Sequence, residues 1–270
     1  MARDEKGRAV PSGRLSRLGG FGRLAAGVAG GVAGEGIRRL ATGERPKLGD
    51  LLLTPGNARK VADQLANLRG AAMKMGQMIS MDAGDMLPAE LADILARLRD
   101  NAQHMPPQQL NKVLVAEWGK GWRTRFQRFE PRAMAAASIG QVHRAIAKDG
   151  RPLAVKVQYP GVKESIDADV DNVTTLLRVS GLLPRELDMA PLLAEAKRQL
   201  HQEADYRREA REMARFAELL AGDDRYVVPL PADDFTTDRV LAMDFIDGAP
   251  IEALATAPQA ERDRVMTVLI

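Results

Sequence analysis

The sequence predicts an α+β fold in which a helical N-terminal half is followed by a small antiparallel sheet and a long helix. Two observations predict this division. Apolar residues recur at three- and four-residue spacing between Val61 and Ile79, whereas short β-like runs begin near Phe126. The hydrophobic fraction of 45% and the charged fraction of 28% are ordinary for a globular protein, so a packed core is expected.

Helices are expected in three stretches of the first half. The apolar period continues over residues 57–98, and Pro88 is expected to open a second helix over 89–99. A third helix is expected over Pro107–Trp118, because two glycines follow and end the pattern.

Strands and long helices are expected in the second half. Three strands come first, and the turn Lys148-Asp149-Gly150 joins the last two as a hairpin. The expected strands are 126–129, 139–147, 153–158, 226–230 and 240–245, and the expected helices are 162–182, 190–220 and the tail. Three strands, a helix and two strands is the order of a protein-kinase small lobe, here with one extra helix inserted.

Composition excludes several kinds of site. The chain has no cysteine, which excludes a disulfide scaffold, a thiolate metal site and a cysteine nucleophile. Its three histidines are far apart and form no ligand-spaced pair, so no metal site is expected in this chain. Aromatic residues make up only 4%, so Leu, Ala, Val and Met are expected to fill the core.

The basic charge is concentrated at the N-terminus. Residues 1–47 hold ten Lys/Arg against four Asp/Glu, whereas the remainder holds 29 against 32. A basic arm suits an anionic surface, and a membrane is preferred because the arm leads into an apolar run at 24–34. That run of 11 residues is short of the roughly 20 that span a bilayer, so docking or interfacial contact is favoured over a span. Binding of nucleic acid is not expected, because the arm lacks interleaved aromatic residues and the body is slightly acidic.

Two neighbouring segments carry the signals for a phosphate-binding site. Lys156 lies in the apolar run 153–157, where a lysine is costly unless it is paired, although a lysine on an edge strand facing water gives the same pattern. Just upstream, Ala135-Ala136-Ala137-Ser138 forms a small-residue loop whose backbone could approach phosphates, with Ser138 as a hydrogen-bond donor. An Ala/Ser loop is more often an ordinary turn or helix cap.

Two helical segments carry further charged motifs. Glu203 and Glu209 are about 1.7 turns apart on the expected helix and so point to different faces, which a solvated charged face would also explain. Lys74 and Gln77 share a helix face, and Gly76 between them costs about 1 kcal/mol of helix propensity. The glycine indicates close packing, or a tolerated glycine on a surface helix.

The segments K-M-G-Q, A-A-A-S-I-G-Q-V-H-R-A, L-A-V-K-V-Q-Y-P-G and E-A-D-Y-R-R-E-A occur in that order between residues 74 and 210. Together they resemble the UbiB family of atypical kinases, also called aarF-domain-containing kinases, and in particular the branch that acts in coenzyme Q biosynthesis. The resemblance covers about residues 10–250. It implies a protein-kinase-like small lobe, with its five-stranded antiparallel sheet and a long helix, covered by a helical N-terminal extension.

The resemblance also implies a role for each motif. It makes the loop 135–138 a phosphate cover and Lys156 the nucleotide anchor, paired with Glu209. The hinge residues whose backbone would contact adenine are Met243, Asp244 and Ile246. The residues with a regulatory role are Lys74 and Gln77 of K-x-G-Q and Glu203 and Asp205 of E-x-D. An otherwise buried lysine needs an anionic partner, so Lys74 is expected near Glu203 or Asp205.

One departure from the kinase pattern concerns catalysis. Only 22 residues follow Gly248, and they contain no catalytic-loop Asp, metal-binding Asn or D-F-G Asp. Two runs resemble D-F-G but do not qualify as that motif, because both precede the end of the hinge and lack the glycine: Asp234-Phe235-Thr236 and Asp244-Phe245-Ile246. The chain is therefore expected to be a fragment, a truncated product or one piece of a split protein. Four parts are expected: a leader at 1–47, the extension at 48–122, the small lobe at 123–248 and the start of a truncated large lobe at 249–270.

The functional expectation is an ATP- or ADP-binding kinase-like protein that supports ubiquinone biosynthesis and is inactive as this chain alone. Mg²⁺ is expected only with the missing large lobe. The expected partners are a nucleotide, a membrane surface or isoprenoid lipid, and ubiquinone-biosynthesis proteins. A cytoplasmic location peripheral to an inner membrane is expected, since no signal peptide is present. The alternative is a non-catalytic, membrane-associated module that binds a lipid or a partner.

Overall fold

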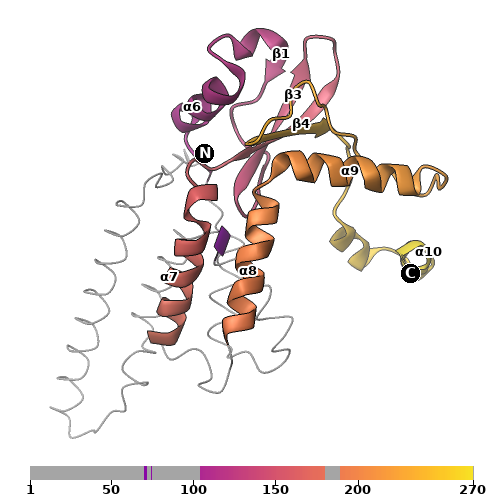
Figure 1. Ribbon diagram of the computed structural model, residues 1–270. Coiled ribbons are helices and arrows are strands. Elements are labelled where there is room, and N and C mark those ends of the chain that lie inside the picture. Colours follow the sequence, from indigo (N-terminus) through magenta and orange to yellow (C-terminus); the bar gives the residue numbers. More distant parts are fainter. Residues whose placement is uncertain (1–69, 72–73, 75–103, 180–188, 270) are drawn as a thin grey trace, which may run out of the picture.

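A computed structural model of the protein describes residues 70–71, 74, 104–179 and 189–269. In these residues, a small antiparallel sheet lies against several helices (Figure 1). The leader, Gln77 and most of the expected N-terminal extension lie outside the described residues, so the predictions for them stay predictions.

The sheet has five antiparallel strands, and one of its two inner strands, β4, carries Lys156. The strand order is β1-β3-β4-β5, and the short β2 pairs with the start of β3. In the register of the inner strands, Lys156 lies opposite Val142 on one side and Leu241 on the other. The strands are β1 Phe126–Phe129, β2 Ala135–Ala136, β3 Gly140–Ala147, β4 Pro152–Gln158 and β5 Val240–Asp244.

The strand expected at 226–230 is wrong, although the expected number of strands is right. Residues 226–230 form no strand, and only an isolated bridge between Pro231 and Met243 follows them. The prolines at 229 and 231 have no N–H to donate, so a regular ladder cannot form across them. The fifth strand is instead β2, formed by the alanines of the expected phosphate-covering loop.

The helix expected at 190–220 is two helices. It breaks between α8 and α9, where the Asp205 side chain accepts a hydrogen bond from the backbone N–H of Arg208 at 2.9 Å. This is an N-cap, which begins a new helix. The α-helices are α6 Pro107–Trp118, α7 Ile166–Val179, α8 Met189–Glu203, α9 Tyr206–Leu220 and α10 Gln259–Leu269.

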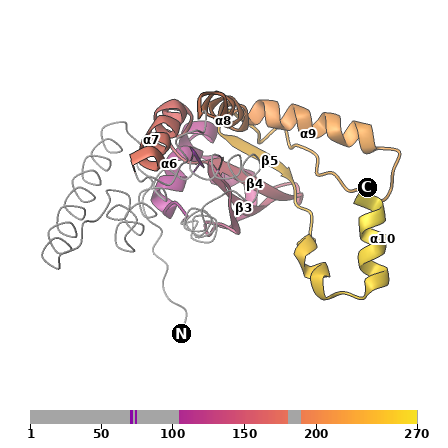
Figure 2. The same cartoon turned by 90° about the horizontal axis from the view of Figure 1, so that it is seen from below.

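The helices surround the sheet unequally. In Figure 1, α7 and α8 run side by side below the sheet, and α9 extends sideways from the upper end of α8. Both views place α7 next to α8 and α10 away from the sheet (Figures 1 and 2). An ion pair and a hydrogen-bond contact join α7 to α8: Lys197 pairs with Asp171 at 2.7 Å, and Nε2 of His201 contacts the Asp167 carboxylate at 3.1 Å. Such exposed pairs contribute little stability individually, so packing between the helices carries the arrangement.

The core on one face of the sheet is aromatic. The alternating residues Leu153, Val155 and Val157 of β4 are fully buried against α6 and its neighbours. Five aromatic side chains form a cluster in this core: Trp118, Trp122, Phe126, Phe129 and Phe235. Helix α6, which was expected to belong to the extension, shares this core with the sheet.

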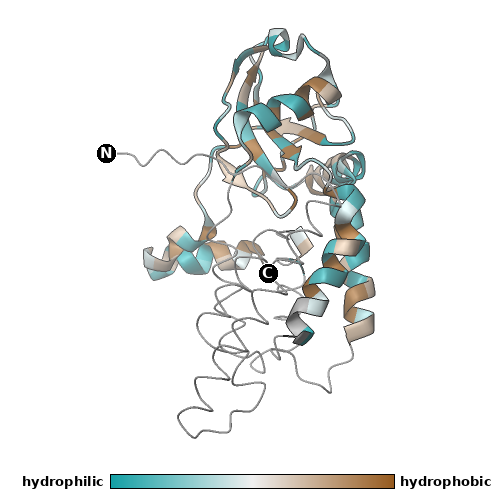
Figure 3. Cartoon of the chain, turned by 90° about the vertical axis from the view of Figure 1, so that its left-hand side faces the viewer, coloured by the Kyte–Doolittle hydropathy of each residue, from teal (hydrophilic) through white to brown (hydrophobic). Residues whose placement is uncertain are grey.

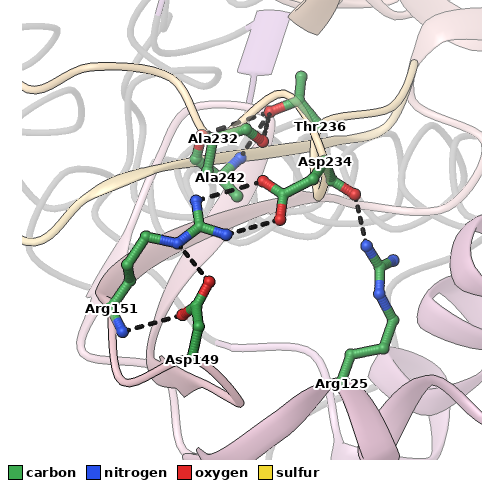
Figure 4. Close-up of polar contacts among 7 residues, drawn as sticks. All are labelled: Arg125, Asp149, Arg151, Ala232, Asp234, Thr236 and Ala242. Carbon is green, nitrogen blue, oxygen red and sulfur yellow. Dashed lines mark hydrogen bonds and ion pairs between the residues drawn. The ribbon is translucent and has the colours of Figure 1, made fainter.

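Asp234, the aspartate of the D-F-T run that resembles D-F-G, has a structural role in the described part of the chain. Its carboxylate pairs with Arg151 at 2.6 Å, and its backbone carbonyl accepts a hydrogen bond from Arg125 (Figure 4). Arg151 also pairs with Asp149 in the β3–β4 turn at 2.7 Å. These contacts join the hairpin to the segment that leads into β5.

Large apolar side chains are exposed mainly in the second half of the described chain. Among the described residues, eight of the nine exposed large apolar side chains lie from residue 216 onward: Phe216, Leu219, Val227, Leu230, Ile246, Ile251, Met266 and Leu269. Figure 3 shows the hydropathy of these segments. Such a surface is typical of one that another domain or partner covers. Within the described residues, no helix has both the length and the apolar character needed to cross a membrane.

Candidate functional site

The centre of the candidate site is an ion pair between β4 and α9. The ammonium Nζ of Lys156 donates to Oε1 of Glu209 at 2.6 Å, and the two side chains are 18% and 33% exposed. Because β4 lies between β3 and β5, Lys156 is not on an edge strand, which removes the alternative of an edge lysine facing water. Its neighbours in sequence, Val155 and Val157, face the opposite, aromatic core, so the strand's alternation places Lys156 on the α9 face.

The small-residue loop folds back onto β3 as a short hairpin. The backbone N–H of Met134 donates to the carbonyl of Val142 at 2.8 Å, and that of Ala137 donates to the carbonyl of Gly140 at 2.8 Å. Ala135 is exposed, while Ala136 and Ala137 are partly buried. The loop therefore has a defined shape beside Lys156 and presents small side chains.

Gly140 is required at the base of this hairpin by packing. A Cβ atom at this position would lie 2.5 Å from the carbonyl oxygen of Val157 and 2.9 Å from the hydroxyl of Tyr206. The first of these atoms is backbone and cannot move away cheaply. The sequence suggested that small residues here allow a phosphate to approach the backbone. The structure shows that Gly140 is also needed because a side chain would collide with the backbone of Val157.

Glu203 joins the extension to the loop. Its Oε1 accepts from Nζ of Lys74 at 2.6 Å, and its Oε2 accepts from Oγ of Ser138 at 3.0 Å. Lys74 therefore lies next to Glu203, as expected, while Asp205 caps α9 instead. The expected donor Ser138 is thus already bonded to a carboxylate. Since a hydroxyl has one proton, it donates to Glu203 or to a phosphate, not to both at once.

The expected hinge residues lie at the end of β5. Met243 pairs with Ala154 of β4, and the backbone N–H of Asp244 donates to the carbonyl of Leu230 at 3.0 Å. The Asp244 carboxylate accepts from the Leu230 N–H at 3.0 Å, so both groups of Asp244 stabilise the turn into β5. Ile246 follows and is 48% exposed.

Sequence reasoning missed two residues that touch this site. Tyr206, the first residue of α9, is fully buried with its ring 4.9 Å from Nζ of Lys156. Gln158, two residues after Lys156 on β4, donates from Nε2 to the carbonyl of Ala204 at 2.8 Å. Both lie inside the quoted motifs, at Y of E-A-D-Y and Q of K-V-Q, and only the fold shows that the two segments meet. Among the described residues, no group of three or more His, Asp or Glu could hold a metal ion.

A lysine on an inner strand, paired with a helix carboxylate beside a hairpin of small residues, defines the small lobe of a protein-kinase-like fold. The chain belongs to the ABC1 atypical kinase-like family, because the profile of the ABC1 atypical kinase-like domain matches residues 97–270.

Relatives agree with this assignment. The chain is 42% identical over 258 residues to the atypical kinase COQ8, mitochondrial, of Saccharomyces cerevisiae, covering 96% of this chain and 52% of that protein. It is 41% identical over 263 residues to the atypical kinase coq-8, mitochondrial, of Caenorhabditis elegans, covering 95% of this chain and 35% of that protein. The chain therefore spans about half the length of the yeast relative, and less of the nematode one.

A solved structure shows the same fold. The structure of a complex of Rv3197 with erythromycin, from Mycobacterium tuberculosis, matches with a TM-score of 0.50 and 32% sequence identity. The match covers 77% of this chain and 54% of that one.

Proposed function

We propose that this chain forms the nucleotide-binding lobe of an ATP- or ADP-binding atypical kinase that supports ubiquinone biosynthesis. The observation that carries the proposal is the 2.6 Å ion pair between Lys156 and Glu209 on the inner strand β4. In kinase-type sites a lysine held in this way contacts the α- and β-phosphates. The place in ubiquinone biosynthesis rests on the resemblance to the coenzyme Q branch of the family.

The residues around Lys156 fit a nucleotide. An ammonium has three donors, and Glu209 accepts one of them, which leaves protons for phosphate oxygens. The exposed Ala135 and the short strand β2 allow a backbone approach, and β5 ends nearby with Met243, Asp244 and Ile246 as candidates for contact with adenine. We place any Mg²⁺ on residues outside this chain, because the resemblance assigns the metal ligands to the large lobe.

Nucleotide binding by the full chain tests the proposal. Equilibrium dialysis with labelled ATP and ADP, with and without Mg²⁺, is expected to show binding that Lys156→Ala removes. Lys163→Ala is the matched control, because Lys163 is an exposed lysine in the turn before α7. Circular dichroism confirms that each variant is folded. Equal affinity in Lys156→Ala and in the unmodified chain would falsify the proposal.

We also propose contact with a membrane surface through the leader, at the periphery of an inner membrane. Its support is the excess of Lys/Arg over Asp/Glu in residues 1–47, ten against four. Co-sedimentation with vesicles containing anionic lipid is expected, and deletion of residues 1–47 is expected to abolish it. If deletion leaves co-sedimentation intact, the leader is not the contact. If binding to vesicles persists while no nucleotide binds, the non-catalytic alternative holds instead.

A further inference from the structure

Tyr206 occupies an unusual place for a tyrosine. Its side chain is fully buried, and its hydroxyl has no hydrogen-bond partner among the described residues. Burial raises the pKa of the phenol well above its ordinary value, and the Glu209 carboxylate acts in the same direction, so the group stays neutral. The hydroxyl lies against Gly140, where no side chain fits beside it. A buried hydroxyl without a partner is unfavourable, so hydrogen bonding does not explain this residue.

The ring of Tyr206 has a clear contact. Nζ of Lys156 lies 4.9 Å from the ring centroid, within the range of a cation–π interaction. Glu209, which accepts from the same ammonium, follows three residues later on α9. Residues three apart share a helix face, so one turn of α9 presents both a carboxylate and a ring to Lys156.

The start of α9 is itself held in register with Lys156. Gln158 lies two residues from Lys156 on β4 and therefore on the same face of the strand. It donates to the carbonyl of Ala204, just before α9 begins, at 2.8 Å in a buried hydrogen bond. Asp205 then caps the helix. The strand that carries the ammonium thus also fixes the turn that carries the ring.

We propose that Tyr206 is a positioning residue of the nucleotide site, whose buried ring holds the Lys156 ammonium in place beside Glu209. The inference rests on the proposed function, because the ammonium is placed for phosphate oxygens. With the ring absent, Lys156 keeps one carboxylate as its only support among these contacts. Its ammonium then samples more positions, and ordering it on a phosphate carries a larger entropic cost.

A double-mutant cycle tests the contact without any ligand. Unfolding by urea is measured for the full chain and for Tyr206→Leu, Lys156→Met and the double variant. Tyr206→Leu is expected to lower the free energy of unfolding by less in the Lys156→Met background, because no cation contacts the ring there. Phe235→Leu is the matched control, because it removes another buried ring, in the aromatic cluster. Its loss is expected to be the same in both backgrounds.

Nucleotide affinity tests the role. Tyr206→Leu is expected to weaken binding about five- to thirty-fold, which is about 1–2 kcal/mol at 1.4 kcal/mol per factor of ten. Tyr206→Phe keeps the ring and is expected to bind like the unmodified chain, as is Phe235→Leu. If Tyr206 only fills the core, Tyr206→Leu and Phe235→Leu are expected to have the same nucleotide affinity.

The outcomes separate the two proposals. If the two substitutions lower the free energy of unfolding additively, the inferred contact between Tyr206 and Lys156 is wrong. If Tyr206→Leu leaves nucleotide affinity unchanged, the positioning role is wrong. If the unmodified chain binds no nucleotide, the proposed function fails and the positioning role fails with it. The coupling between Tyr206 and Lys156 would still be seen in that case, which distinguishes this failure from an absent contact.

Discussion

His143 is expected to make the stability of the lobe depend on pH. It is fully buried on β3, where its Nδ1 contacts the carbonyl of Glu130 at 2.8 Å and its Nε2 contacts the Gln141 amide nitrogen at 2.9 Å. A neutral ring with its proton on Nδ1 satisfies both contacts, donating to the carbonyl and accepting from the amide. The Gln141 Oε1 in turn accepts from the Met105 N–H at 2.7 Å. A protonated ring would have to give up the Gln141 bond.

Burial lowers the pKa of His143 from 6.5 to about 4, against a smaller opposite effect of the Glu130 carbonyl, and the nearby His104 lowers it further. Between these two pH values the unfolded chain binds a proton that the folded chain does not. The stabilisation is therefore complete above pH 6.5 and is lost as the pH falls to about 4. A shift of this size corresponds to about 3 kcal/mol, at 1.36 kcal/mol per pKa unit.

Urea unfolding from pH 4 to 7.5 measures this dependence. The free-energy difference between the unmodified chain and His143→Gln isolates the titration of His143 from that of the carboxylates. This difference is expected to shift by about 3 kcal/mol as the pH falls from 7 to 4. His201→Gln is the control, because His201 is exposed beside Asp167. A constant difference across the pH range would refute the inference that the buried ring is held neutral.

Three further predictions concern Gly140, the cap of α9 and the exposed pair of Asp234, with Gly222→Ala as a control. Gly140→Ala is expected to lower the free energy of unfolding by about 1–3 kcal/mol, because the added Cβ would collide with the Val157 carbonyl. Gly222→Ala is the control and should change it by less than about 0.5 kcal/mol, because the added Cβ enters open space. Asp205→Ala removes the cap of α9 and should cost about 1 kcal/mol in urea unfolding. Asp234→Asn should lower the free energy of unfolding by at most about 1 kcal/mol, since the pair with Arg151 is exposed. It should leave nucleotide affinity unchanged, and a loss of affinity would show that Asp234 belongs to the site.

The sequence alone predicted the inner strands and the residues of the central ion pair. The apolar alternation from 153 to 157 is a local pattern, because the side-chain period of a strand decides which residues share a face. The resemblance then paired Lys156 with Glu209, and the atoms lie 2.6 Å apart. Lys74 near an acid followed from the cost of burying an unpaired charge, and only the structure chose Glu203 over Asp205.

Other features depended on contacts between distant segments. The break between α8 and α9 lies in a stretch of charged and small residues that suits a continuous helix, and a hydrogen bond from Gln158 to the Ala204 carbonyl accompanies it. Residues 226–230 look like a strand by composition, yet Pro229 and Pro231 interrupt the N–H groups of a ladder, and Leu230 instead pairs with Asp244. Tyr206 meets Lys156 only because β4 and α9 pack together. Local periodicity determines which face a residue takes, whereas the partner on that face is decided by how the elements pack in three dimensions.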